Sequence, residues 1–453
     1  MDAEATRQAV AHLLRRAAFG GHADEIDALA AKGYAAAVDA VCDFSSADAA
    51  ADAIAPPEFD TAGYLAARAT ADESARQTAR QRAAEERRAL VLWWLQRMVQ
   101  ADHPHREKSA LLWHDHFATS IQKVKVAELM HRQRAAFYDL GHVHFDELLT
   151  TMVSDPAMLI WLDGRESTVK APNENFAREF FELFTLGHVA GHHAVPDDHS
   201  RTAHDDGPPY TERDVAEAAR AFTGWRFGRT EAGPVLDPRR HDAGTKTVLG
   251  RTGQLGGEDV VALATAHPAC APHVVARLWS RVARPAGPDD EVVVELAESF
   301  AADLDLGALR RRMFEHADFL AASTRTALLK TPVELVVGSA RALRVSLDRR
   351  YLRVLAALGQ LPFSPPDVAG WPANEGWLST SSALTRVHLG HTMAAEADLS
   401  TVEGLAAARR PEALARLLGV AEWSRTTRAA LLAADEPIAS LTVALAAPEH
   451  LLA

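Results

Sequence analysis

The residues best suited to chemistry lie in one stretch, 171–187, which reads APNENFAREFFELFTLG. Asn173 follows a proline and is a good N-cap, so a helix is expected to begin near Glu174. Phenylalanine and leucine fill much of that helix, so its three glutamates and its arginine are expected to be partly buried. Buried charges must pair with one another or bind a cation.

The spacing of these charges supports two interpretations. Glu174, Arg178 and Glu182 are four residues apart and share one helical face, while Asn175 and Glu179 share the neighbouring face. In the structural interpretation, Glu174, Arg178 and Glu182 form an ion-pair network that holds helices together. In the functional interpretation, Glu179 or Glu182 is a metal ligand or general base, and Arg178 binds an anion.

A second cluster is WHDHF at 113–117, which sets His114 and His116 in an apolar stretch. On a continuous helix their side chains point roughly 200° apart and cannot share one ion. If the helix ends here, both can face one site. Core packing is the alternative, because a histidine on an apolar face is commonly a satisfied core residue.

Two polar stretches read as loops. The first, DPRRHDAGTKT at 237–247, contains His241 and Lys246, and binding groups are commonly placed in loops, although a surface turn explains it equally. The second, 188–209, holds five histidines among four aspartates. It is either a solvated loop or a metal-binding loop.

Composition excludes several classes of protein. The two cysteines, Cys42 and Cys270, rule out a disulfide scaffold and a four-cysteine zinc ribbon. The net charge of −13 argues against a general nucleic-acid or anionic-membrane binder. Zincin, nucleophile-elbow, phosphate-loop and dinucleotide motifs are absent from the sequence.

The elements that must position these residues are predicted to be helices. Alanine is abundant and apolar residues recur at helical spacing across the 453 residues. The prediction is a mainly α, large multi-helix single domain with a small irregular or β-containing section near 225–257. Residues 1–395 form the main domain with 188–209 as an inserted loop, and 396–453 form a C-terminal helical extension packed on it. The helices are expected at 70–100, 106–120, 131–139, 144–153, 174–186, 211–223, 258–283, 289–304, 307–315 and 325–344.

Neither a secretory signal nor an apolar run of about 20 residues is visible, so a cytoplasmic protein with no membrane contact is expected. Residues 359–378 are dense in proline, glycine and tryptophan. They are predicted to form an ordered loop, because Trp371 and Trp377 need burial.

Seven runs of the sequence resemble the bacterial family catalogued as domain of unknown function 1800. They are HLLRRAAFG at 12–20, WHDHF at 113–117, DPAMLIWLD at 155–163, APNENFAREFFELFTLG at 171–187, YTERDVAEAARAFTGW at 210–225, HDAGTKTVLG at 241–250 and PPDVAGWP at 365–372. The resemblance covers about residues 8–393. It implies export and a protein partner that resembles sulfatases and alkaline phosphatases. The chain departs from the family pattern in having no evident signal and in the insertion at 188–209.

Three hypotheses for function follow. The leading one is a metal-dependent hydrolase or oxidoreductase acting on a small anionic or polar substrate with zinc, iron or manganese. Its metal ligands would be His114, His116, Glu179, Glu182 and His241. Glu179, Arg178 and Lys246 would be its catalytic residues, and Asn173, Asn175, Arg178 and Lys246 would bind the substrate.

The second hypothesis is a metal-free enzyme or small-molecule binding protein, with Glu179 as base and Arg178 and Lys246 holding an anion. The third is a non-catalytic helical scaffold for a partner protein, in which the ion pairs are architectural. Replacing Glu179 or Glu182 by Gln discriminates them, because a scaffold would be left with an unpaired buried arginine.

Overall fold

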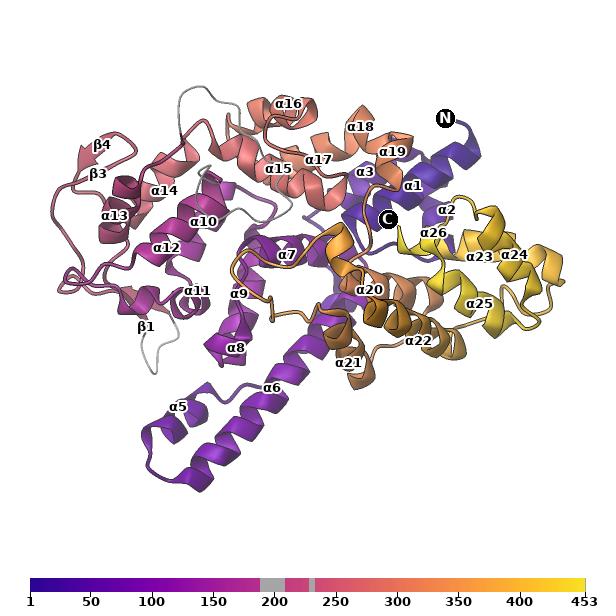
Figure 1. Cartoon of the computed structure of the whole chain (residues 1–453), viewed down its shortest axis with the longest axis horizontal. Coiled ribbons are helices and arrows are strands. Elements are labelled where there is room, and N and C mark those ends of the chain that lie inside the picture. Colours follow the sequence, from indigo (N-terminus) through magenta and orange to yellow (C-terminus); the bar gives the residue numbers. More distant parts are fainter. Residues whose placement is uncertain (188–207, 228–232, 453) are drawn as a thin grey trace.

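The computed structural model describes residues 1–187, 208–227 and 233–452, and in these it contains 26 α-helices and two small sheets (Figure 1). The mainly α prediction is therefore confirmed. The inserted loop predicted at 188–209 lies almost wholly outside the described residues. Among the described helices, none is both long enough and apolar enough to cross a membrane.

The first half of the chain supplies the helices around the central core. They are α1 (Ala3–Ala17), α2 (Ala23–Lys32), α3 (Tyr34–Val41), α4 (Ala49–Asp52), α5 (Thr61–Ala69), α6 (Glu73–Gln100), α7 (Pro104–His116), α8 (Ile121–Val124), α9 (Ala127–Leu140), α10 (Phe145–Ser154) and α11 (Pro156–Trp161).

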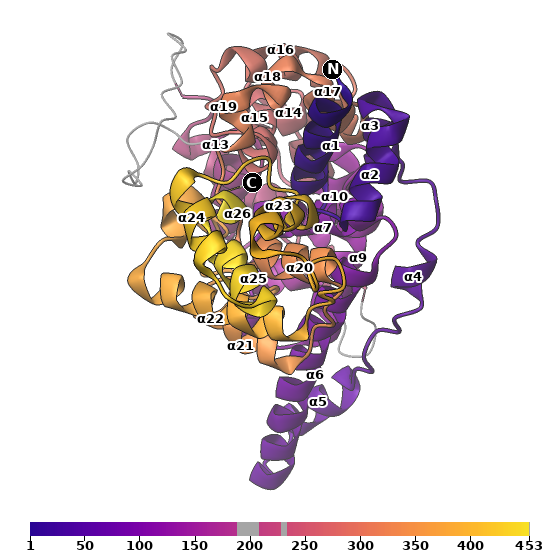
Figure 2. The ribbon, with the colours of Figure 1, turned by 90° about the vertical axis from the view of Figure 1, so that its right-hand side faces the viewer.

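Helix α6 divides into a polar half and an apolar half, as its sequence predicts. Its N-cap Asp72 accepts hydrogen bonds from the backbone N–H groups of Ser74 and Ala75. The polar half pairs with α5 and projects from the body as an arm (Figures 1 and 2). The apolar half enters the core, where Trp94 is fully buried. The change in polarity near Leu90 marks the point where the helix leaves solvent.

The middle of the chain brings the helices and strands that surround the candidate site. They are the 3-10 turn η1 (Gly164–Glu166), α12 (Glu174–Glu179), the π-helical segment η2 (Phe180–Thr185), α13 (Glu212–Ala221), β1 (Trp225–Phe227), β2 (Pro234–Leu236), β3 (Lys246–Val248), β4 (Arg251–Gly253), α14 (Gly257–Thr265), α15 (Cys270–Val282), α16 (Glu291–Phe300), α17 (Leu306–Glu315), α18 (Ala317–Leu320) and α19 (Ala322–Arg325).

Four short strands form the predicted β-containing section. β1 pairs antiparallel with β2, with Trp225 opposite Leu236, and β3 pairs antiparallel with β4, with Lys246 opposite Gly253. The helical stretch expected at 258–283 consists of two helices, α14 and α15. Pro268 lies in the break between them, where a proline lacks the N–H that a continuous helix needs.

The last third of the chain is helical to its end. Its elements are α20 (Pro332–Leu343), α21 (Arg349–Leu358), η3 (Asn374–Trp377), α22 (Thr380–Glu396), η4 (Ala407–Arg409), α23 (Arg410–Leu418), α24 (Arg425–Ala433), α25 (Pro437–Ala446) and α26 (Pro448–Leu451). α20 begins at Pro332 rather than near 325, because Thr331 and Glu334 form a capping box there.

The C-terminal helices pack beside the N-terminal ones (Figure 2). Arg15 of α1 donates to the carbonyl of Gly419, which caps α23, at 2.6 Å. Arg7 of α1 donates to the carbonyl of Arg416 at 3.0 Å and pairs with Asp27 of α2 at 2.7 Å. The two ends of the sequence therefore share one packed region.

Candidate functional site

The candidate site is built where α12 changes into a π-helical segment. Asn173 caps α12 as predicted, and its Oδ1 accepts the N–H groups of Asn175 at 3.0 Å and Phe176 at 3.4 Å. Its Nδ2 donates to the carbonyl of Leu162 at 2.7 Å. The side chain of Asn173 is thus occupied in fixing the start of the helix. The widened turn at Phe180–Thr185 follows directly, and such turns occur frequently at functional sites.

Arg178 is held by a residue outside its own helix. Both of its terminal nitrogens lie 2.7 Å from the carboxylate of Glu212 at the start of α13, one to each oxygen. This bidentate pair joins α12 to α13. The structural interpretation of Arg178 was therefore partly right, although the partner comes from the next helix rather than from Glu174.

Glu179 has no hydrogen bond or ion pair to any residue that the structure describes. Its side chain is half-buried. Burial, together with the negative charges of Glu182 and Asp367 and against a lowering by Arg178, raises the pKa of Glu179 to about 7. A glutamate with this pKa is half protonated at neutral pH, so it can both give and take a proton.

Tyr210 borders the same group of carboxylates. It is buried, and its ring stacks on Phe181 with centroids 5.1 Å apart. Burial raises the pKa of Tyr210, as do Glu182, Glu212 and Glu179. Its hydroxyl therefore stays protonated and available as a donor.

His114 and His116 are both buried and have different neighbours. Nε2 of His114 accepts the N–H of Phe363 at 3.0 Å, and burial lowers its pKa to about 3. Nε2 of His116 lies 3.2 Å from the carbonyl of Phe184. Burial lowers the pKa of His116 well below its ordinary value, and the charge of Arg277 lowers it further. Both rings are neutral parts of the core.

Asp115, which sequence reasoning did not single out, fastens the proline-rich loop to the end of α7. It accepts the N–H of Trp371 at 2.8 Å and pairs with Arg281 of α15 at 2.6 Å. The burial predicted for Trp371 and Trp377 is confirmed. The loop also carries Asp367, so Asp115 helps to position the third carboxylate of the site. The place of Asp115 between two histidines in WHDHF is the sequence feature that could have pointed to it.

Gly370 is the residue that lets this loop approach Asp115. Its φ is +96°, and a Cβ there would lie 2.6 Å from both the backbone oxygen and Oδ1 of Asp115. We expect Gly370→Ala to lower the free energy of unfolding by about 2–4 kcal/mol, from backbone strain and the clash together. Denaturant unfolding measures this. Gly404→Ala is the matched control, since Gly404 also has a positive φ but nothing within 4 Å. Equal losses in both variants would contradict the close approach.

Lys246, Asp242 and His241 stabilise the turn that leads into β3. Lys246 is 1 % exposed, and its Nζ donates to the carbonyls of Asp242 at 2.5 Å and Gly244 at 3.0 Å. Nδ1 of His241 lies 2.9 Å from the carbonyl of Thr223. These contacts occupy the Nζ of Lys246 and one of the two ring nitrogens of His241.

The five predicted metal ligands are thus spread over four separate environments: that of His114, that of His116, that shared by Glu179 and Glu182, and that of His241. No group of three or more histidine, cysteine, aspartate or glutamate side chains within the described ranges is arranged to hold a metal ion. The metal site stays a prediction. The structure does bring Glu179, Glu182 and Asp367 into one electrostatic group.

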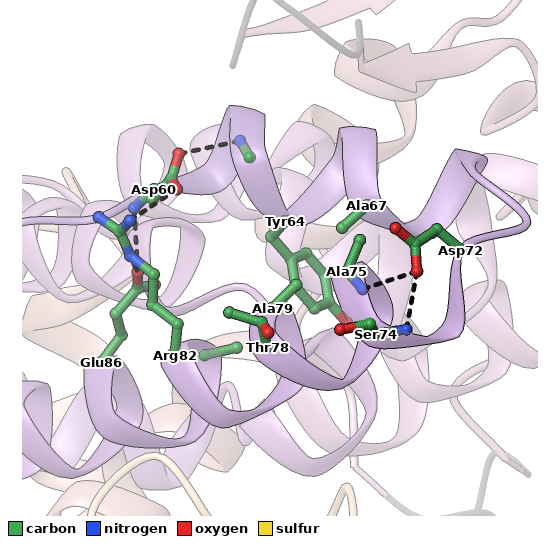
Figure 3. A pocket seen from close by; sticks show the side chains of 12 residues that line it. Asp60, Tyr64, Ala67, Asp72, Ser74, Ala75, Thr78, Ala79, Arg82 and Glu86 are labelled. Atoms are coloured by element: carbon green, nitrogen blue, oxygen red, sulfur yellow. Dashed lines mark hydrogen bonds and ion pairs between the residues drawn. The ribbon is translucent and has the colours of Figure 1, made fainter.

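A cavity of about 400 Å³ lies elsewhere, between α5 and α6 in the arm (Figure 3). Its charged groups already have partners: Arg82 pairs with Asp60 at 2.9 Å and with Glu86 at 3.3 Å. Tyr64 lines the space between the two helices (Figure 3). We assign this cavity to loose packing of the arm rather than to chemistry.

Comparison with known proteins gives one family. The family model described as "Protein of unknown function (DUF1800)" matches residues 12–452, nearly the whole chain. Neither the search of curated proteins nor that of solved structures returned a match.

Proposed function

The chain belongs to the DUF1800 family, proteins of unknown function, and we propose that it carries a metal-free acid–base site in which Glu179 exchanges a proton with a small substrate. The observation that carries the proposal is the isolation of Glu179. A half-buried carboxyl without a hydrogen-bond donor or a cation partner in the described chain is costly to keep. Such groups persist where a ligand supplies the missing partner.

The charge of the surroundings suggests the class of substrate. Glu182 and Asp367 both add negative potential at Glu179, while Arg178 is already engaged with Glu212. A neutral polar molecule or a cation is favoured over an anion by this balance. Of the small anionic or polar substrates expected from the sequence, the polar ones are therefore favoured.

The chemistry follows from the protonation state. At neutral pH a population of Glu179 is protonated and can donate to a leaving group, while the remainder can accept a proton from water or from a substrate hydroxyl or ammonium. The hydroxyl of Tyr210, kept protonated by its surroundings, is a second donor beside these carboxylates. A carboxyl and a hydroxyl of different acidity, placed near each other, are a common arrangement for acid–base catalysis.

The test is ligand binding to the wild type and to Glu179→Gln. Neutral polyols, primary amines and carboxylates are screened at pH 7 by ligand-observed NMR, and affinities are measured for those that bind. We expect polyols or amines to bind, and the variant to bind at least about tenfold more weakly, because one charge-assisted hydrogen bond is lost. Glu174→Gln, exposed on the same helix, is the matched control and should bind as the wild type does.

Two outcomes would overturn the proposal. One is equal binding of every ligand by the wild type and Glu179→Gln, or no binding at all. The other is elemental analysis of untagged protein that finds near-stoichiometric zinc, iron or manganese, with loss of the ion in His114→Ala and Glu179→Gln. That second result would restore the metal-dependent hypothesis.

A further inference from the structure

A second surface of the molecule combines exposed apolar and basic side chains that the proposed acid–base site does not use. It lies where the loop 167–172 meets β2 and the turn 237–240 that follows β2. Val169, Val235 and Leu236 are 43 %, 48 % and 42 % exposed. Ten large apolar side chains are exposed in the described chain, and three of them gather here. Single exposed apolar side chains are ordinary, but a group of them marks an interaction surface.

Three hydrogen bonds hold the loop, the turn and the strands together. The backbone N–H of Val169 donates to the carbonyl of Arg240 at 2.7 Å, and Nη2 of Arg240 donates to the carbonyl of Arg165 at 2.9 Å. At the other end of the turn, the N–H of Asp237 donates to the carbonyl of Gly224, just before β1, at 2.9 Å. The side chains that this arrangement brings to one surface, here called the docking patch, are Val169, Lys170, Val235, Leu236, Arg239 and Arg240.

The docking patch carries more positive than negative charge. Most carboxylates of the adjoining segments are already paired with a basic neighbour: Asp163 with Lys123 at 2.7 Å, Glu166 with Arg165 at 3.2 Å and Asp237 with Arg226 at 3.3 Å. Glu174, at the start of α12, is the remaining one and is exposed. The three basic side chains of the patch are thus left with one carboxylate, in a chain whose net charge is −13.

These basic side chains have capacity to bind. Lys170 and Arg239 are exposed, and their side chains form no hydrogen bond or ion pair with any residue that the structure describes. Arg240 is half-buried, and its Nε is buried without a partner among the described residues. Ammonium and guanidinium groups form their strong, charge-assisted hydrogen bonds with carboxylates and other anions.

β2 offers backbone groups beside these side chains. It pairs with β1 alone, and all three of its residues are exposed. The other edge of β2 is therefore unpaired within the described chain, and an extended segment of another molecule can lie along it. Pro234 has no N–H, so only Val235 and Leu236 of this strand can donate to such a segment.

We propose that the docking patch binds a short acidic segment of a partner protein, with carboxylates on its three basic side chains and apolar side chains on its three apolar ones. A membrane or a nucleic acid presents an extended anionic surface, which would also meet the rest of this acidic chain and be repelled by it. A short segment meets the patch alone, because charges beyond about 8 Å are screened at physiological salt. The docking patch and Glu179 are separate, and neither proposal depends on the other.

The experiment measures the fluorescence anisotropy of two labelled peptides of about ten residues, long enough to span β2 and the turn. One contains glutamate and valine in equal number, and the other has glutamine in place of every glutamate. We expect the glutamate peptide to bind the full-length protein, and to do so more weakly as salt is raised. The glutamine peptide should bind at least about tenfold more weakly, because its charge-assisted pairs are lost.

Three variants locate the binding. The double variant Lys170→Glu, Arg239→Glu should bind the glutamate peptide at least about tenfold more weakly, because like charges then meet. Leu236→Ser should weaken binding at least about threefold through the loss of apolar contact, with the charge unchanged. Lys32→Glu, at an exposed position of α2, is the matched control and should bind as the wild type does. The unfolding midpoints should match that of the wild type, since every replaced side chain is exposed.

Several results would overturn the proposal. They are no binding of either peptide, equal binding of both, and binding that neither the double variant nor Leu236→Ser weakens. Vesicles of phosphatidylcholine and phosphatidylglycerol test a membrane as the occupant, and light scattering over a range of protein concentrations tests a second copy of the chain. Vesicle binding or dimer formation that the double variant abolishes would assign the docking patch to that occupant instead.

Discussion

Glu107→Gln is expected to lower the free energy of unfolding by about 3–5 kcal/mol, the largest single loss that the structure predicts. Glu107 in the first turn of α7 is 0 % exposed. It accepts from Trp94 Nε1 at 2.9 Å and from Arg97 Nε at 2.8 Å, both on α6, and pairs with Arg134 on α9. Its neutral replacement leaves the buried Arg134 short of counter-charge and leaves the buried Arg97 with the exposed Asp52, at 3.2 Å, as its ion-pair partner. It also weakens the contacts among three helices.

Urea unfolding of the wild type and the variant measures this loss. Glu85→Gln is the matched control, because Glu85 pairs with Arg88 on the exposed part of α6, where an ion pair contributes only about 0–1 kcal/mol. If Glu107→Gln lowers the free energy of unfolding as little as the control does, then water reaches the two arginines. Glu107 would then not be the residue that holds α6, α7 and α9 together.

Glu179→Gln is expected to have the opposite effect and to stabilise the protein at alkaline pH. The folded-state pKa of Glu179 is about 7, above the ordinary value of 4.5 that applies in the unfolded chain. The folded state therefore binds this proton more tightly than the unfolded state does. Ionisation of Glu179 costs no folding stability below pH 4.5, where both states are protonated. The loss of stability grows between pH 4.5 and 7 and reaches its full size above pH 7. The variant should gain about 2 kcal/mol at pH 8 and nothing at pH 4.

Stability curves at a series of pH values check this sign. Asp155→Asn is an informative comparison, since burial raises the pKa of Asp155 to about 7 as well. Asp155 is fully used, however, in capping α11 through the N–H of Met158 and in accepting from Gln133. The Asp155→Asn variant should therefore be more stable than the wild type above pH 7 and should bind ligands as the wild type does. Destabilisation of Glu179→Gln at pH 8 would show that its carboxylate has a counter-charge.

This expectation reverses the one that the sequence suggested for a scaffold. Sequence spacing placed Arg178 with Glu174 and Glu182, so that loss of a glutamate would strand an arginine. The observed partner, Glu212, lies 34 residues further along the chain. Helical periodicity reports which residues share a face, but it cannot report which side chain of another helix meets that face.

The helices themselves were largely predictable because their signals are local. The break in polarity along α6, the cap at Asn173 and the capping box at Thr211 and Asp214 can all be read from neighbouring residues. The π-helical turn after Glu179 could not be foreseen. It depends on packing, with His116 against the carbonyl of Phe184 and His273 against that of Leu183.

The central residue of the candidate site, Glu179, could be selected from the sequence, but the residues around it from distant parts of the chain could not. Glu179 was selected as a base from its place among phenylalanines, and its isolation in the fold is compatible with that role. Asp367 lies 188 positions away in the sequence, and the attachment of the proline-rich loop to His114, Asp115 and Arg281 brings it close. Long-range placement of this kind leaves no periodic trace in a single sequence.

The contact between Arg15 and Gly419 has a consequence for the order of events during synthesis. The two residues are 404 positions apart. At the usual rate of translation, about 20–80 s pass between the appearance of the first and that of the second. During this time α1 can pack against α2, α3 and α7, but Arg7 and Arg15 lack the carbonyls of Arg416 and Gly419. The hydrogen bonds that join α1 to the end of α23 therefore form only after most of the chain has been synthesised.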